Sequence, residues 1–167
     1  MADFEARVER SLRKNFPIYE YMDFKVESAS GGVYRAAVPL NEENSNHFDT
    51  VHAALQWASL EALGGLVWIA VKPEDRSLLP VVKRFEIDFK RPATTDITAE
   101  TKFSESEAAA MRAALAADGR CDFELESTIR NTAGEVVAEG KGFYSVRKAS
   151  AITGAWRSAP TTRDPAS

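Results

Sequence analysis

The longest run of apolar residues in the chain extends from Val51 to Val71 and is apolar on nearly every side of a helical wheel. A helix of this kind has to be surrounded by other structure, because it has no polar face to turn towards water. The pattern therefore predicts a buried central helix over about residues 50–71. Asp49 or Thr50 is the predicted N-cap, since either side chain can accept hydrogen bonds from the first amides of the helix.

Polar residues and glycines interrupt this run at specific places. His52, Gln56 and Glu61 lie among the apolar residues, and burying such groups costs several kcal/mol unless they are paired or used. Gly64 and Gly65 each disfavour a helix by about 1 kcal/mol relative to alanine. The sequence therefore predicts that a functional site lies on this helix and that another backbone packs closely against the two glycines.

Amphipathic segments flank the central helix. Phe4, Val8 and Leu12 recur at helical spacing and predict a helix over residues 3–14. Ser104 and Glu107 form a capping-box pattern before an alanine-rich helix that Asp118-Gly119 ends. Strand patterns occupy six segments, at residues 22–28, 33–40, 81–91, 97–103, 121–131 and 135–147.

The order of these elements predicts an α+β fold, an antiparallel sheet curled around the central helix, because only that helix can cover the apolar face of the sheet. We expect one domain over residues 1–150, followed by a mobile tail at 151–167. About 20 apolar residues can also span a bilayer. The three polar side chains, the glycine pair and the missing basic flank before the helix argue against a membrane span.

Composition narrows the functional classes. The 167-residue chain has a net charge of −4, which argues against general nucleic-acid binding because phosphate contacts need a basic face. One cysteine, Cys121, and two histidines supply no ligand set for zinc, so we expect no metal and no cofactor. The charged N-terminal segment contains no apolar signal region, and the expected location is cytoplasmic.

Three fragments resemble the hotdog-fold acyl-CoA thioesterases of the phenylacetate-pathway and hydroxybenzoyl-CoA kinds. Asn46 is followed by Ala53 seven positions later and by Glu61 eight positions further, similar to the family's Asn or Gln, helix-start Gly and Asp or Glu. His52 is similar to the His of the His-Gly-Gly…Asp pattern. The segments IDFKRPA (87–93) and EVVAEGKGFYSV (135–146) resemble two of the family's strands.

The resemblance implies hydrolysis of an acyl-CoA thioester. The amide of Ala53 would hold the carbonyl, Glu61 would act as base or nucleophile, and Asn46 would orient water or the carboxylate, with His52 also in the site. This sequence departs from the family in having Ala53 in place of the helix-start Gly. It also has Gly65 where one branch places a hydroxyl residue that holds water.

Helix geometry supports a shared site. His52 and Glu61 are nine residues apart, so they lie near opposite sides of a helix and roughly 13 Å apart along its axis. If both act on one substrate, the second residue comes from a symmetry mate, which predicts a homodimer or a dimer of dimers. The family shares its site between subunits in this way.

Basic residues near the ends of the strand at 81–91 are candidates for binding coenzyme A phosphates. They are Lys83, Arg84, Lys90 and Arg91. Alternation places Lys83 on the apolar face of this strand together with Phe85, which is unusual for a lysine.

Other interpretations stay open. A non-catalytic acyl-CoA-binding hotdog domain would keep the same fold. A hotdog dehydratase would use His47, fourteen positions before Glu61, although the prolines and Pro-Gly of that family are missing from residues 48–56. Glu61 can also be a buried, inert carboxylate, and His52 can be a structural residue that bonds the backbone at the start of the helix.

Overall fold

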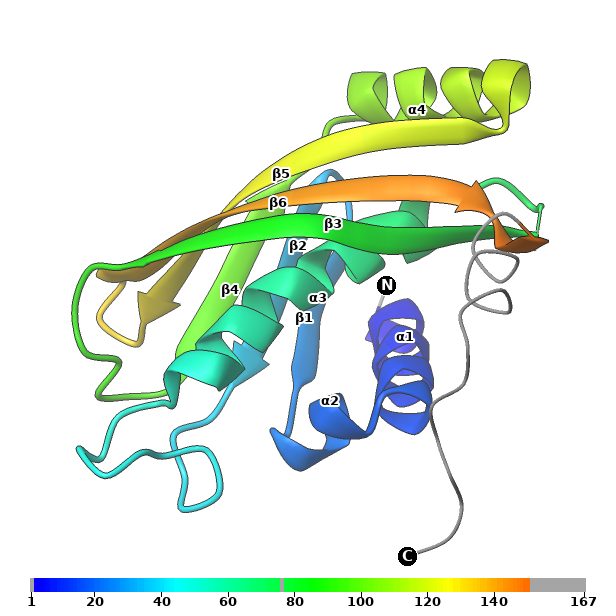
Figure 1. The fold of residues 1–167 in the computed structure, drawn as a ribbon. Helices are drawn as coiled ribbons and strands as arrows, with labels where there is room; N and C mark the ends of the chain where they lie inside the picture. The colour runs from blue at the N-terminus through cyan, green and yellow to red at the C-terminus, as the bar shows by residue number, and fades with distance from the viewer. Residues whose placement is uncertain (1, 76, 151–167) are drawn as a thin grey trace, which may run out of the picture.

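The computed structural model describes residues 2–75 and 77–150. A six-stranded antiparallel sheet in the order β1-β2-β4-β5-β6-β3 curves around the long helix α3 (Figure 1). This is the predicted hotdog fold. The strands are β1 (Lys25–Ser30), β2 (Val33–Val38), β3 (Leu78–Phe89), β4 (Ile97–Lys102), β5 (Arg120–Asn131) and β6 (Val136–Lys148). The helices are α1 (Ala2–Asn15), α2 (Pro17–Tyr21), α3 (Ala53–Val71) and α4 (Glu105–Asp118).

The core lies between α3 and the concave face of the sheet. Leu60, Leu63 and Val67 of α3 are fully buried there. Within the described residues, α3 is the one helix long and apolar enough to cross a membrane, and 61% of its most apolar window is buried inside the protein. The all-round apolar pattern is therefore explained by the sheet that wraps the helix.

The predicted N-cap of α3 is wrong. The chain is not yet helical at Val51, whose amide donates to the Ala93 carbonyl at 2.9 Å. Thr50 bonds the Asn46 side chain instead of a helical amide, and Asp49 has a left-handed backbone with φ of 55°. The N-cap is His52, whose Nδ1 accepts from the Ala54 amide at 3.0 Å.

The prediction for the two glycines of α3 is partly wrong. A Cβ atom on Gly64 would lie 2.2 Å from Cε1 of Tyr144, so this glycine does make room for a close neighbour. The neighbour is an aromatic ring of β6 rather than a backbone. A Cβ atom on Gly65 would meet nothing within 4 Å.

Lys83 does not lie on the apolar face of β3, because a β-bulge interrupts the alternation. The pairing of β3 with β6 shifts between Val82 and Arg84, which leaves Lys83 as the extra residue. The Lys83 side chain is exposed, and its Nζ lies 2.9 Å from an Asp122 carboxylate oxygen.

The remaining elements agree with the predictions apart from their ends. Ser104 and Glu107 form the predicted capping box of α4, and Gly119 ends that helix in the left-handed conformation. The pairing of β5 with β4 is limited to the second half of β5, and α4 lies beside the first half (Figure 1). The short helix α2 was not predicted. The predicted tail at 151–167 lies outside the described residues.

Candidate functional site

The start of α3 leaves one amide available to a ligand. The Ala54 amide donates to the His52 ring, and the amides of Leu55 and Gln56 both donate to the His52 carbonyl, at 2.9 and 3.1 Å. The Ala53 N–H donates to no atom of the described residues. An unpaired amide at a helix N-terminus favours negative charge, because the helix dipole adds to its own partial charge.

A groove of about 640 Å³ lies in front of this amide. Four of the predicted site residues line this groove, namely Asn46, Ala53, Lys90 and Arg91. The exposed side chains of Phe48 and Phe89 supply its apolar walls. The structure therefore brings together the helix start, the asparagine and the two basic residues at the end of β3.

The Asn46 side chain organises the loop before α3. Its Oδ1 accepts from the amides of Phe48 and Thr50, at 2.9 and 3.3 Å, and from the Thr50 hydroxyl at 3.2 Å. Because all three partners are donors, these contacts fix which end of the amide group is oxygen. The Asn46 Nδ2 donates to no described residue and remains available to a ligand.

Glu61 lies two turns further along α3, one turn after the exposed Trp57 and one turn before Gly65. The Tyr19 hydroxyl of α2 donates to its Oε2 at 3.1 Å. Burial raises the pKa of the Glu61 carboxyl, and the hydrogen bond from Tyr19 opposes that rise. The Oε1 atom makes no hydrogen bond with the described residues, which leaves it free to accept a proton or to attack a carbonyl.

The structure does not join Glu61 to Asn46 and Ala53 within one chain. The groove at the helix start contains Asn46 and Ala53 but not Glu61. His52 uses Nδ1 as the helix cap, so the interpretation of His52 as a structural residue agrees with its observed contact. His47 is exposed, and its ring packs on Phe48 with centroids 3.8 Å apart rather than near the carboxylate.

The four basic candidates form ion pairs and do not gather in one cluster. Lys90 Nζ lies 3.1 Å from a Glu139 oxygen, and Arg91 Nη1 lies 2.6 Å from a Glu135 oxygen. Arg84 contacts Glu86 and stacks over the Phe143 ring at 4.7 Å, outside the groove. Lys83, on the β3 bulge, is also outside the groove.

Two residues near the site were missed from the sequence. Tyr19 was missed because α2 was missed, although Pro17 at the first position of a helix is a usable signal. Asn44 is completely buried, and its Nδ2 donates to the carbonyls of Met22 and Pro39, at 3.0 and 2.9 Å. Nothing in its local sequence indicates burial, since it lies in a polar loop.

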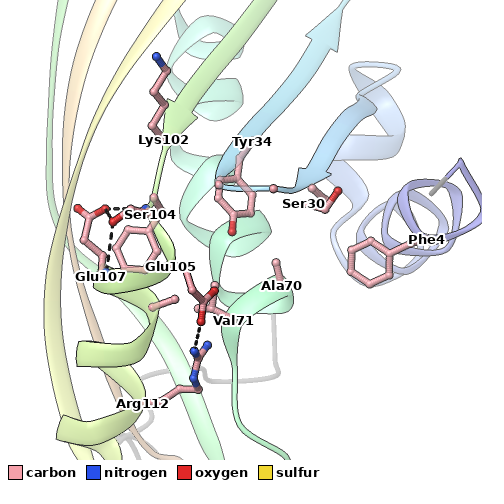
Figure 2. Close-up of a pocket in the computed structure, with 15 residues that line it drawn as sticks. Phe4, Ser30, Tyr34, Ala70, Val71, Lys102, Ser104, Glu105, Glu107 and Arg112 are labelled. Carbon is pink, nitrogen blue, oxygen red and sulfur yellow. Dashed lines mark hydrogen bonds and ion pairs between the residues drawn. The ribbon is translucent and has the colours of Figure 1, made fainter.

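A second cavity, of about 800 Å³, lies at the other end of α3. Phe4, Tyr34 and Val71 line it, the Tyr34 hydroxyl points into it, and Arg112 pairs with Glu105 on its rim (Figure 2). None of the predicted site residues lines this cavity. Within residues 2–75 and 77–150, no group of three or more His, Cys, Asp or Glu side chains could hold a metal ion.

Comparison with known proteins supplies a family and a fold. The family model described as a domain of unknown function (DUF4442) matches residues 5–145. No curated protein sequence matches the chain.

Solved structures of the same fold include proteins named thioesterases. A Pseudomonas aeruginosa protein of unknown function, called a probable thioesterase, has a TM-score of 0.75 and 24% identity over 86% of this chain and 95% of that chain. A Chlorobaculum tepidum protein of unknown function has a TM-score of 0.78 and 21% identity, over 87% and 94%. A mutant thioesterase from Pseudomonas aeruginosa has a TM-score of 0.68 and 11% identity, over 86% and 94%. At these identities the similarities establish the fold.

Proposed function

The chain belongs to the family described as a domain of unknown function (DUF4442), and we propose that it hydrolyses an acyl-CoA thioester to the free acid and coenzyme A. The observation that carries the proposal is Glu61. A carboxylate on the core helix, largely buried, with a raised pKa and one unbonded oxygen, is suited to general-base or nucleophilic chemistry. The names of structures with the same fold agree with this reaction.

The unpaired amide at the helix start supplies the second part of the chemistry. The thioester carbonyl oxygen would accept a hydrogen bond from the Ala53 N–H, where the helix dipole stabilises the negative charge that develops during attack. The free Nδ2 of Asn46 borders the same groove and can donate to the carbonyl or to the attacking water.

Glu61 has two possible roles in the bond-making step. As a general base, its Oε1 removes a proton from water while the water oxygen attacks the carbonyl carbon, and the carbon–sulfur bond then breaks to release the thiolate of coenzyme A. As a nucleophile, Oε1 attacks the carbon directly and forms an anhydride, which water hydrolyses in a second step. Both routes give the same products.

A second copy of the chain would bring the two parts together. At the β3 edge of the sheet, β3 pairs with β6 on one side and, among the described residues, with no strand on the other. Exposed Val82 and Phe89 lie on this strand, and an apolar edge invites pairing with another chain. The proposal is a homodimer or dimer of dimers, in which the helix start of one subunit faces Glu61 of the other. Sedimentation that finds an active monomer at micromolar concentration would refute it.

Lys90 and Arg91 are the preferred candidates for the coenzyme A phosphates, because they line the groove. Their present partners are exposed carboxylates, and exposed ion pairs contribute about 0–1 kcal/mol. A phosphate group can therefore replace these partners at little cost. Lys83 and Arg84 rank lower because they lie outside the groove.

Thiol release from acyl-CoA thioesters of increasing chain length tests the proposal. We expect turnover by the wild-type protein and a loss on the order of 100-fold or more in Glu61→Gln, which keeps the shape of the side chain and removes its basicity. Glu126→Gln is the matched control, since it neutralises an exposed carboxylate on β5. Equal turnover in the two variants would make Glu61 a structural residue.

The same preparations separate the competing functions. A hotdog dehydratase would convert a hydroxyacyl thioester to the unsaturated product without releasing thiol. An acyl-CoA-binding domain would bind the thioesters and turn over neither class of substrate. Either result with the wild-type protein would refute the proposed hydrolysis.

A further inference from the structure

The short helix α2 contacts the proposed catalytic carboxylate through a single side chain. The Tyr19 hydroxyl donates to Glu61 Oε2 at 3.1 Å, and 7% of Tyr19 is exposed. We propose, on the basis of the proposed function, that Tyr19 is a positioning residue of the active site: it orients Glu61 so that Oε1 faces the substrate. Under this proposal α2 is part of the catalytic framework rather than a connection between α1 and β1.

The Tyr19 ring has little freedom to move. It packs against Phe16 and Phe24, with ring centroids 5.4 and 5.0 Å away. The Tyr19 amide donates to the Phe16 carbonyl at 2.9 Å, and its carbonyl accepts from the Phe24 amide at 3.0 Å. A hydroxyl on a ring held in this way can fix the direction of a neighbouring carboxylate.

The C-terminal end of α2 is itself held by contacts with two other segments. Arg13 of α1 donates to the carboxylates of Glu20 and Asp23, at 2.6 and 2.9 Å. The Tyr21 hydroxyl donates to the Glu43 carbonyl at 3.0 Å, in the loop that leads to Asn46. These contacts connect α2 to α1 and to the loop before α3.

Burial and this hydrogen bond together shift the pKa values of both partners. Burial, together with the nearby Glu61 charge, raises the pKa of Tyr19, so its hydroxyl keeps its proton and acts as the donor. Among the residues that the structure describes, the other titratable group that faces Glu61 is Tyr144 of β6, whose hydroxyl donates to the Glu61 backbone carbonyl at 3.2 Å. Neither is a cation, so the Tyr19 bond is the specific interaction that favours the ionised carboxylate against desolvation.

Tyr19→Phe tests the inference, because it keeps the packed ring and removes only the hydroxyl. We expect kcat to fall on the order of tenfold with KM nearly unchanged, since orientation of the reacting group is lost. The acid limb of the kcat/KM profile should move to higher pH, because loss of the hydrogen bond raises the Glu61 pKa further. Tyr34→Phe is the matched control, as it removes the hydroxyl of a buried ring that lines the cavity at the other end of α3 and does not touch Glu61.

If Tyr19→Phe fails to fold, 3-fluorotyrosine at position 19 gives the complementary measurement. Its more acidic phenol is a stronger donor, so the acid limb should move to lower pH. Hydrolysis by the wild type combined with an unchanged limb in the substituted protein would overturn the role of Tyr19 and leave the proposed function in place. A wild type that hydrolyses no thioester would overturn both.

Discussion

Gly64 is the position on α3 where a single methyl group should matter most. A Cβ atom there would lie 2.2, 2.5 and 2.8 Å from Cε1, Cζ and Cδ1 of Tyr144. The ring cannot easily retreat, because its other face stacks on Phe123 with centroids 5.1 Å apart and its edge borders Gly142. Gly64→Ala should therefore displace Tyr144 or α3.

The magnitude is the sum of three effects. Forcing an extra methyl group into a packed core costs about 1–3 kcal/mol, and loss of the hydrogen bond from Tyr144 to the Glu61 carbonyl costs about 1 kcal/mol. Alanine regains about 1 kcal/mol of helix propensity. The net expectation is a destabilisation of about 2 kcal/mol, which lowers the melting temperature of a chain of this size by about 4–8 °C.

The neighbouring glycine is the control. Gly65→Ala adds the same methyl group where nothing lies within 4 Å, so helix propensity alone should raise stability by about 1 kcal/mol, or about 2–4 °C. Thermal and urea unfolding at one fixed protein concentration measures both variants. A Gly64→Ala protein that melts at or above the wild-type temperature would refute the packing argument.

Two further substitutions test the framework around the site. Asn44→Ala should lower the free energy of unfolding in urea by about 2–4 kcal/mol, because it removes the donor from the buried carbonyl of Met22 and from the partly buried carbonyl of Pro39; a loss no larger than that of exposed Asn15→Ala would contradict this. His52→Ala should cost about 1 kcal/mol through loss of the N-cap, and His52→Asn, which can cap, should recover most of it. Equal melting temperatures for the two His52 variants would argue against the cap.

The pattern of apolar and polar residues was sufficient to predict most of the fold. The run from Val51 to Val71 has no polar face, so burial follows from composition alone, and the structure places α3 in the core. The capping box of Ser104 and Glu107 was predictable because its two hydrogen bonds depend only on local spacing. The sheet order β1-β2-β4-β5-β6-β3 was not predictable in this way, since strand pairing is not local.

Local rules failed where a tertiary contact competed with them. Thr50 is a good N-cap residue, but its amide and hydroxyl bond the Asn46 side chain, and the Val51 amide bonds the distant Ala93 carbonyl. The cap therefore moves to His52. Alternation failed at Lys83 because the bulge against β6 adds one residue to β3, and no signal in the β3 sequence marks that position.

For the site, sequence spacing found the polar groups but not their surroundings. Asn46 and Ala53 do border one groove, as their positions in a loop and at a helix start suggest. Glu61 was identified as an ionisable group in an apolar helix, and burial does raise its pKa. Tyr19 was beyond reach because its contact with Glu61 joins residues 42 positions apart.

Asn44 shows why the framework of the site leaves so little trace in the sequence. Its Nδ2 donates to the carbonyl of Met22, directly after the helix that carries Tyr19, and to the carbonyl of Pro39. The backbone carbonyl of Asn44 accepts from the His52 amide at 2.9 Å, directly before the unpaired amide of α3. Through its side chain and its backbone carbonyl, one buried residue therefore links the helix that contacts the carboxylate to the helix start that would hold the carbonyl. Because its partners are backbone groups, many residue types at those positions would serve, and no motif arises. The residues proposed to act on substrate, Asn46, Ala53 and Glu61, stand at a recognisable spacing in the sequence. The contacts of Asn44 that hold their surroundings are made to backbone groups, which leave no such pattern.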